Sequence, residues 1–369
     1  MTPVLSRRAL GRATLARQFL LDRTAAAVPE VVAHLVGLQA QTPHTWYTGL
    51  WSRVADFTPG RAADLLLNRE LVRMAVMRST IHLVTARDAL ALRPAVQPVL
   101  DRGLTRDHTR GRDGRELDVG AVVAAARALL AEKPRTQKEV GALLHERWPG
   151  HAPGSLAHVV RCLVPLVQVP PRGVWGRSGP VAHTTPEAWL GAPAADEPRL
   201  ADLVLRYLAA FGPATVKDVQ TWSGLTRLRE VVERLPLLRL RDEDGQELFD
   251  LPDAPRPDED VPAPPRFLYD YDNLLLSHAD RRRVVTGDVR AQNYDPHGPV
   301  PQFFLVDGVT AGDWRLHRGK GVATLELRPF HRLPDPDEVE REAARLLAFL
   351  APDAPRHEVR TTSPAAPRP

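Results

Sequence analysis

The stretch that decides the fold is RLADLVLRYLAAFGPATVKDVQTWSGLTRLREVVERLPLLRLRDEDGQELFDL, residues 199–251. An amphipathic helix comes first, and two shorter helical segments follow, which begin at Thr215 and Thr226, residues suited to N-caps. Two apolar strands then flank Asp244 and Gly245, a dipeptide typical of hairpin turns. Three helices followed by a two-stranded wing is the order of a winged helix-turn-helix, which we predict for this segment.

The same order of elements recurs between residues 118 and 183. Asp118 caps a helix, Thr136 opens a second through the Thr-x-x-Glu of a capping box, and Ser155 opens a third. A Pro-Pro-Arg-Gly turn then separates two short strands. In the N-terminal third, helices near 5–21, 29–38 and 59–68 precede two apolar strands around 77–79.

These repeats predict an α+β chain built from three tandem winged-helix units. A strand-rich segment follows them, in which Asp307 and Gly308 mark a further hairpin and a last helix runs from Asp335 to Leu350. The three predicted winged-helix units are residues 1–116, 117–195 and 196–262, and the third unit includes an acidic linker. We predict a β-rich C-terminal region with the final helix at residues 263–352, and a disordered tail at residues 353–369.

Composition narrows the class of protein. Of the 369 residues, 43% are hydrophobic and 25% charged, which is ordinary for a globular protein. No apolar run approaches the ~20 residues of a membrane-spanning helix, so we expect no membrane contact and a cytoplasmic location. The single cysteine, Cys162, lies in an apolar run, which predicts a buried core thiol rather than a disulfide or a zinc cluster. We expect a monomer with no obligate protein partner, metal or cofactor.

Basic charge is made almost entirely of arginine. Lysine occurs only at 133, 138, 217 and 320 among 49 basic residues, and the formal net charge is +4. A GC-rich coding bias explains this composition as well as selection for a polyanionic partner does. Winged helices commonly bind DNA, with one helix in the major groove, although some serve as protein-interaction spacers. Three such units make double-stranded DNA the expected partner.

A pair of glutamines stands where a helical pattern breaks, in HLVGLQAQTPHTWYTGLW, residues 34–51. Gly37 loosens the helix end, and Pro43 disfavours helical geometry at the residue before it. On an extended segment residues two apart share a face, whereas on a helix they lie roughly 200° apart. Gln39 and Gln41 can therefore point into one pocket, although spacing alone favours surface or capping glutamines.

The surroundings of this pair resemble a known family. LQAQTPHTWYTGLWSR followed by VRMAVMRSTIHLVTARD, and later RYLAAFGPATVKDVQTWSGL and FLYDYDNLLLSHADRRRVV, resemble the AlkZ and YcaQ type of winged-helix DNA glycosylases in order and spacing. The resemblance spans nearly the whole chain. It implies a C-shaped, basic DNA channel and catalysis by a Gln-x-Gln or Gln-x-Asp motif, here Gln39 and Gln41. The Gln-x-Gln form resembles the AlkZ branch, which is associated with self-resistance to DNA-alkylating natural products.

Amides suit one kind of glycosylase chemistry. Breaking the bond between base and deoxyribose passes through an oxocarbenium-like sugar, so an enzyme ordinarily helps the base to leave and positions a water. An N7-alkylated purine already carries positive charge and leaves as a neutral base without a general acid. A glutamine carbonyl accepts hydrogen bonds and its NH2 donates them, so a pair can hold one water at the anomeric carbon.

Supporting roles fall to residues around the pair. Arg78, Thr80 and His82 alternate on a predicted strand, so they share a face that lines the pocket or merely ties the sheet to a loop. His44 and Trp46 follow the pair closely enough to shape the pocket entrance.

DNA contacts are expected from the segment YDNLLLSHADRRRVV. Its polar residues Asn273, Ser277 and His278 are candidates to reach DNA. The densest basic run forms a phosphate clamp, or otherwise a solvated charged face, at Arg281, Arg282 and Arg283.

The sequence therefore predicts a monofunctional DNA glycosylase that hydrolyses bulky or crosslinking N7-alkylpurine adducts. The alternative is a non-catalytic winged-helix DNA-binding protein, such as a transcription regulator. The sequence has no G-x-x-x-x-G-K-[ST] loop and no G-x-S-x-G elbow. It also has no H-E-x-x-H pair, and His145, His151 and His158 lack the spacing of metal ligands, which argues against a metal enzyme.

Overall fold

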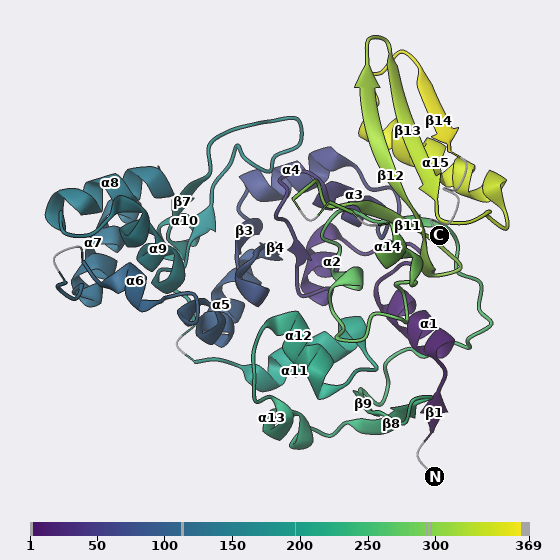
Figure 1. Ribbon diagram of the computed structural model, residues 1–369, viewed down its shortest axis with the longest axis horizontal. Coiled ribbons are helices and arrows are strands. Elements are labelled where there is room, and N and C mark those ends of the chain that lie inside the picture. Colours follow the sequence, from purple (N-terminus) through teal and green to yellow (C-terminus); the bar gives the residue numbers. More distant parts are fainter. Residues whose placement is uncertain (1–2, 112–113, 196, 293, 296, 363–369) are drawn as a thin grey trace.

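The chain folds into an α+β structure, seen in a computed structural model that describes residues 3–362 except 112, 113, 196, 293 and 296 (Figure 1). Its N-terminal third supplies the elements that surround the glutamine pair: β1 (Val4–Leu5), α1 (Arg7–Arg17), α2 (Val28–His34), β2 (Leu38–Gln39), α3 (Trp46–Trp51), α4 (Pro59–Leu67), β3 (Leu71–Ala75), the 3-10 turn η1 (Met77–Ser79) and β4 (Ile81–Thr85). Ser6 caps α1 by accepting a hydrogen bond from the Ala9 amide, and Pro59 is the first residue of α4, as its Thr-Pro start predicts.

Helices of the second segment form the lobe at the left of Figure 1. They are α5 (Ala86–Asp101), α6 (Arg106–Thr109), α7 (Val119–Glu132), α8 (Gln137–Arg147), α9 (Pro153–Leu163) and α10 (Pro186–Leu190). Caps by Asp118 and Thr136 are confirmed, and the latter forms the expected capping box with Glu139. Helix α9 begins at Pro153 rather than at Ser155, because proline is already suited to the first helical turn. Cys162 is a buried free thiol, as predicted.

A six-stranded sheet joins this lobe to the N-terminal third. Its strand order is β2-β4-β3-β6-β7-β5, with β5 (Arg135–Thr136), β6 (Val167–Gln168) and β7 (Ala182–Thr184). Antiparallel pairing of Arg73 with Gln168 links the hairpin β3–β4 to the hairpin β6–β7. The two hairpins expected to be separate wings therefore share one sheet, which places residues 167–184 beside the glutamine pair.

The segment quoted first lies at the bottom of Figure 1 and contains α11 (Leu200–Phe211), α12 (Val216–Ser223), α13 (Arg229–Glu233), β8 (Leu238–Asp242) and β9 (Glu247–Asp250). The predicted hairpin is confirmed, with Gly245 at φ 80°, and β1 adds to β8 in parallel. Thr215 caps α12 as expected. Helix α13 is shorter than predicted, because it begins after Leu228 rather than at Thr226.

A five-stranded sheet with one covering helix forms the C-terminal region, at the upper right of Figure 1. It comprises β10 (Arg266–Phe267), η2 (Asn273–Leu275), α14 (Asp288–Ala291), β11 (Gln302–Val306), β12 (Val309–Gly319), β13 (Val322–Pro329), α15 (Pro336–Leu350) and β14 (His357–Thr361). The hairpin at Asp307 and Gly308 and the helix capped by Asp335 are confirmed.

The predicted disorder of residues 353–369 is wrong for its first part. Strand β14 pairs in parallel with β13, with Val359 opposite Leu325. The backbone of residues 357–361 thereby gains sheet hydrogen bonds that proline content alone does not forecast. Residues 363–369 lie outside the described residues.

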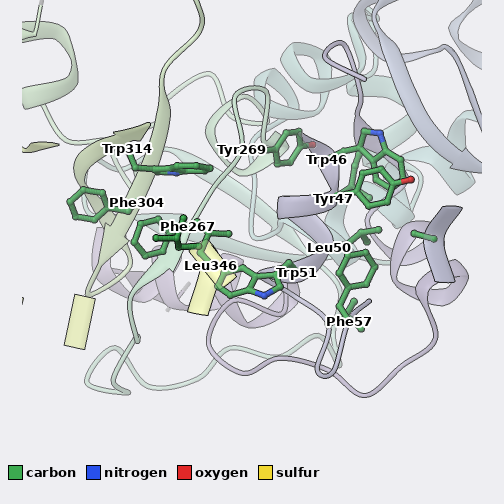
Figure 2. Packing of buried hydrophobic residues seen from close by; sticks show 14 of the residues in the cluster. Trp46, Tyr47, Leu50, Trp51, Phe57, Phe267, Tyr269, Phe304, Trp314 and Leu346 are labelled. Atoms are coloured by element: carbon green, nitrogen blue, oxygen red, sulfur yellow. The ribbon is translucent and has the colours of Figure 1, made fainter. Parts of the chain in front are cut away.

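The largest apolar core lies between this C-terminal sheet and the N-terminal helices. Figure 2 shows Trp46, Tyr47 and Trp51 of α3 on one side of it, and Phe267 and Trp314 of the sheet on the other. The rings of Trp46 and Tyr47 stack with centroids 3.8 Å apart. This core therefore holds helix α3, which follows the glutamine pair, against the C-terminal sheet.

Two buried ion pairs tie distant segments together. Arg53, two residues after the end of α3, binds both Asp272 oxygens, with Nη2–Oδ1 2.7 Å and Nη1–Oδ2 2.9 Å. Arg17 at the end of α1 binds Asp250 in the same two-point manner. Among the described residues, no helix is long and apolar enough to cross a membrane.

Candidate functional site

A polar cavity of about 620 Å³ opens between the β3–β4 turn, the β6–β7 hairpin and the start of α8. It is lined by Gln39, Gln41, Ser79, Thr80, Ile81, Thr136, Gln137, Arg161, Gln168, Val181, His183 and Tyr271. Four of these residues carry an amide side chain, and none of these described lining residues is an aspartate or glutamate. The cavity therefore offers many neutral hydrogen-bonding groups and no carboxylate.

Gln39 is the more buried of the two central glutamines. Its backbone pairs with His82 across β2 and β4, and its side chain is only 4% exposed. The Gln39 Oε1 accepts a 2.6 Å hydrogen bond from Arg78 Nη2. This contact fixes the side chain, because rotation of the amide would bring its NH2 against the guanidinium donors.

Gln41 lies on the same cavity wall but is exposed. The intervening Ala40 is held from two sides: its N–H donates to Ile81 O at 2.7 Å, and its carbonyl accepts from Arg73 Nη2 at 2.7 Å. The Gln41 Oε1 accepts a longer, 3.3 Å hydrogen bond from the Ile81 amide. Both amides thus line one cavity, as an extended segment requires.

Arg78, Thr80 and His82 do not share one face of a strand. Arg78 and Ser79 form the β3–β4 turn with φ of 54° and 59°, and β4 begins only at Ile81. The alternation predicted here fails because the left-handed turn redirects the Arg78 side chain away from the strand. Arg78 donates to Gln39 Oε1, to Trp222 O at 2.5 Å and to Asn273 Oδ1 at 3.1 Å.

The other two members of this predicted set have separate places. Thr80 lines the cavity, and its Oγ1 donates to Met77 O at 3.0 Å. His82 is fully buried, and its Nδ1 lies 3.0 Å from Thr80 O. Burial, followed by the charge of Arg78, lowers the pKa of His82 to about 3, so this imidazole is neutral at physiological pH.

His44 and Trp46 do not shape the cavity entrance as expected. Trp46 is completely buried in the core seen in Figure 2, and its Nε1 donates to Pro43 O at 2.7 Å. His44 is half-buried, with its Nε2 3.1 Å from Val174 O. Both side chains turn towards packed structure because the loop between β2 and α3 folds back, where Asp270 accepts hydrogen bonds from Thr42 and Thr45.

The polar residues expected to reach DNA are buried instead. Asn273, Ser277 and His278 are each less than 5% exposed. Asn273 Nδ2 donates to Gly37 O at 3.3 Å, and Ser277 Oγ donates to Asn273 O. His278 Nε2 lies 3.0 Å from Phe211 O, and burial lowers its pKa to about 3. These side chains join the C-terminal region to β2 and α11.

The three consecutive arginines occupy three different environments. Arg281 is exposed. Arg282 is also exposed, but its guanidinium forms ion pairs with Asp280 at 2.6 Å and Asp244 at 2.8 Å. Arg283 is 8% exposed and donates to Pro213 O at 2.8 Å. A clamp of three phosphate-binding side chains is therefore wrong, because only Arg281 is both exposed and outside these salt bridges.

Several cavity residues escaped prediction. Arg161 donates to Ser79 O at 3.0 Å, while Gln168 and His183 face each other across β6 and β7. Burial, with the charges of Arg73 and Arg161, lowers the pKa of His183 to about 4. No local pattern marks these residues, because the pairing of β3 with β6 brings them to the site. Tyr271 did carry a signal, since it lies within the quoted motif FLYDYDN.

The fold and cavity define an α+β protein that surrounds an amide-rich site, whose described lining residues include no carboxylate. The chain matches the family model described as DNA glycosylase AlkZ-like over residues 32–349, and it belongs to that family. Family membership makes the protein a DNA glycosylase of DNA repair, with DNA as its substrate. The resemblance to the AlkZ type seen in the sequence is thereby confirmed.

Among solved structures, the DNA glycosylase AlkZ of Streptomyces sahachiroi has the same fold. The two superpose with a TM-score of 0.76 at 21% sequence identity, over 97% of this chain and 100% of that one. A comparison with curated proteins gives no match.

Proposed function

We propose that this glycosylase hydrolyses the N-glycosidic bond of cationic N7-alkylpurines in double-stranded DNA, including bulky and crosslinking adducts, with Gln39 and Gln41 holding the attacking water. The observation that carries this proposal is the chemistry of the cavity lining. It contains four amides and no carboxylate among its described residues, and its imidazole, His183, has a pKa of about 4. A site of this kind positions groups but has no acid–base pair poised near neutral pH.

This chemistry matches an activated leaving group. An N7-alkylated purine departs as a neutral base, so the site need only orient a water at C1′ and tolerate positive charge on the sugar. An uncharged lesion such as uracil needs further stabilisation of its departing anion, which a pair of amides supplies weakly. We therefore propose selectivity for cationic adducts.

The product should be an abasic site rather than a cleaved strand. A glycosylase that also cleaves the strand needs an amine nucleophile to form a Schiff base. Lysine occurs only at positions 133, 138, 217 and 320, and no lysine lines the cavity among the described residues. We propose a monofunctional enzyme on this ground.

We also retain the proposal of three tandem winged-helix units around a C-shaped DNA channel, with the divisions given above for residues 1–262. Helices followed by a hairpin recur three times along the chain, at β3–β4, β6–β7 and β8–β9. The cavity opens where the first two hairpins meet. DNA that contacts both hairpins would pass the glutamine pair. Self-resistance to an alkylating natural product and a monomeric state stay predictions.

The deciding experiment is an excision assay on duplexes that contain one defined lesion each. N7-methylguanine, a bulky N7-alkylguanine and an N7–N7 crosslink are compared with uracil, and free base and abasic sites are quantified separately. Release of modified guanine with intact strands, and little release of uracil, is expected. Binding to one undamaged sequence without base release would instead support a regulator.

A further inference from the structure

We propose that Arg78 is a positioning residue that fixes Gln39 as a hydrogen-bond donor to the cavity and leaves the acceptor role to Gln41. This inference rests on the proposed catalytic function of the two glutamines and assigns them different tasks.

The orientation of the Gln39 amide follows from its neighbour. A guanidinium has only N–H donors, so the Gln39 atom 2.6 Å from Arg78 Nη2 must be the carbonyl oxygen. Oxygen and nitrogen of an amide are often interchangeable in a structure, but here the partner decides between them. The Nε2 group of Gln39 then faces away from Arg78, and the described residues offer it no acceptor. Since Gln39 lines the cavity, a bound water or DNA is left to accept from it.

Arg78 is itself held in place from several directions. Its turn places two consecutive non-glycine residues at positive φ, which persists only where the surroundings determine the backbone. The Arg78 guanidinium also donates to Trp222 O and Asn273 Oδ1, and Arg161 donates to the Ser79 carbonyl in the same turn. Asn273 is anchored in turn by its bond to Gly37 O. The guanidinium therefore cannot follow the Gln39 side chain if that side chain moves.

Charge adds to this geometric effect. The three acceptors of Arg78 are neutral amide oxygens, and burial lowers the Arg78 pKa to about 10, which still leaves it charged at neutral pH. A buried cation on Gln39 Oε1 draws electron density from the amide and strengthens its N–H donors.

Gln41 differs from Gln39 both in its exposure and in which of its amide atoms is available to the cavity. It is exposed, and among the described residues its Oε1 accepts only from the Ile81 amide, at 3.3 Å, so the carbonyl keeps a lone pair for another donor. A water that accepts from Gln39 N–H and donates to Gln41 Oε1 keeps one lone pair for C1′. The water oxygen bonds to C1′ as the bond from C1′ to N9 breaks. The electron pair leaves with the base, which becomes neutral, and the surplus proton passes to solvent.

Carboxylate variants separate the two tasks. Gln39→Glu exchanges the donor for an acceptor of the same size, whereas Gln41→Glu keeps an acceptor. In single-turnover excision of N7-methylguanine, we expect Gln39→Glu to slow the rate as much as Gln39→Ala, by about 10- to 1000-fold. Gln41→Glu should slow the rate less than Gln41→Ala does. Gln246→Glu adds the same charge on the exposed β8–β9 turn and serves as the control. A wild-type rate for Gln39→Glu would overturn the donor assignment.

A double-mutant cycle tests whether Arg78 acts through Gln39. Arg78→Ala should slow excision in the wild-type background and add nothing when Gln39 is already Ala. Additive losses would reduce Arg78 to a merely structural residue. Arg78→Ala removes the donor of three acceptors on buried residues. For this reason Arg78→Lys is measured beside it, together with the thermal unfolding of both variants, and should recover part of the rate. If Gln39→Ala alone excises normally, the proposed catalytic function fails, a result distinct from additivity.

Discussion

At the scale of single residues, the site differs from an acid–base site in that its imidazoles are neutral and its central groups do not titrate. Replacing Gln39 or Gln41 by Ala should leave affinity for lesion DNA largely intact and slow excision by about 10- to 1000-fold, or 1.4–4 kcal/mol. The wild-type rate should be nearly flat between pH 6 and 8, because the pKa values of His82 and His183 lie near 3 and 4. A bell-shaped single-turnover profile in that window would contradict a mechanism based on positioning.

The burial of His82 also makes the free energy of unfolding depend on pH. The pKa of His82 is about 3 in the folded protein and near 6.5 in the unfolded chain, so the unfolded chain binds more protons between these values. Stability from this residue is complete above pH 6.5 and is lost as pH falls towards 3, with a slope of up to about 1.4 kcal/mol per pH unit. Urea unfolding at pH 7, 6 and 5 measures it. His82→Asn should flatten the slope, whereas the exposed His317→Asn should not.

Residue-level prediction succeeded where local chemistry decides the backbone. Gly37 and Pro43 forecast that Gln39 and Gln41 stand on an extended segment, and both line one cavity. Prediction failed for Arg78, because Arg78 and Ser79 have left-handed backbone conformations although the segment RSTIHLV contains no glycine or asparagine to indicate them. It failed again for Asn273, whose burial depends on contacts with Gly37, 236 positions away.

At the scale of elements, the ion pair between Arg53 and Asp272 joins α3 to the segment that carries Tyr271. Both side chains are at most 2% exposed. Asp272→Ala leaves a buried guanidinium without its counter-ion, so the free energy of unfolding should fall by about 3–5 kcal/mol. Urea unfolding gives the value. Glu247→Ala, which removes an exposed partner of Arg239, should change it little. Equal losses in both variants would mean that burial of the first pair is unimportant.

Elements were predictable where caps and turns are local. Thr136 and Asp335 begin α8 and α15, and Gly245 and Gly308 close the two hairpins as the sequence indicates. The sheet that joins β3 to β6 was not predictable, because the paired residues of these short strands are 93 and 95 positions apart and their pairing is set by tertiary packing. That pairing adds Gln168 and His183 to the cavity.

At the scale of the whole molecule, the net charge of +4 does not show which arginines are available to bind DNA. Many are bound within the protein, as Arg17, Arg53 and Arg283 are, and these cannot also bind phosphate. Arg281 is different, because it is exposed and close enough to Arg78 to lower its pKa. It therefore lies near the glutamine pair, where the DNA backbone around a lesion should pass.

This placement gives a salt-dependence prediction. Each phosphate contact releases counter-ions and contributes about 0.9 to the slope of log affinity against log salt. Arg281→Ala should reduce the steepness of that slope by about this amount on lesion and undamaged duplexes alike, because phosphate contacts carry no base information. Arg282→Ala should leave it nearly unchanged, since Asp280 and Asp244 already neutralise that guanidinium. Titrations from 50 to about 200 mM salt compare the variants. An unchanged slope for Arg281→Ala would assign Arg281 to the solvated surface and move the DNA path to other arginines, beginning with Arg161 at the cavity wall.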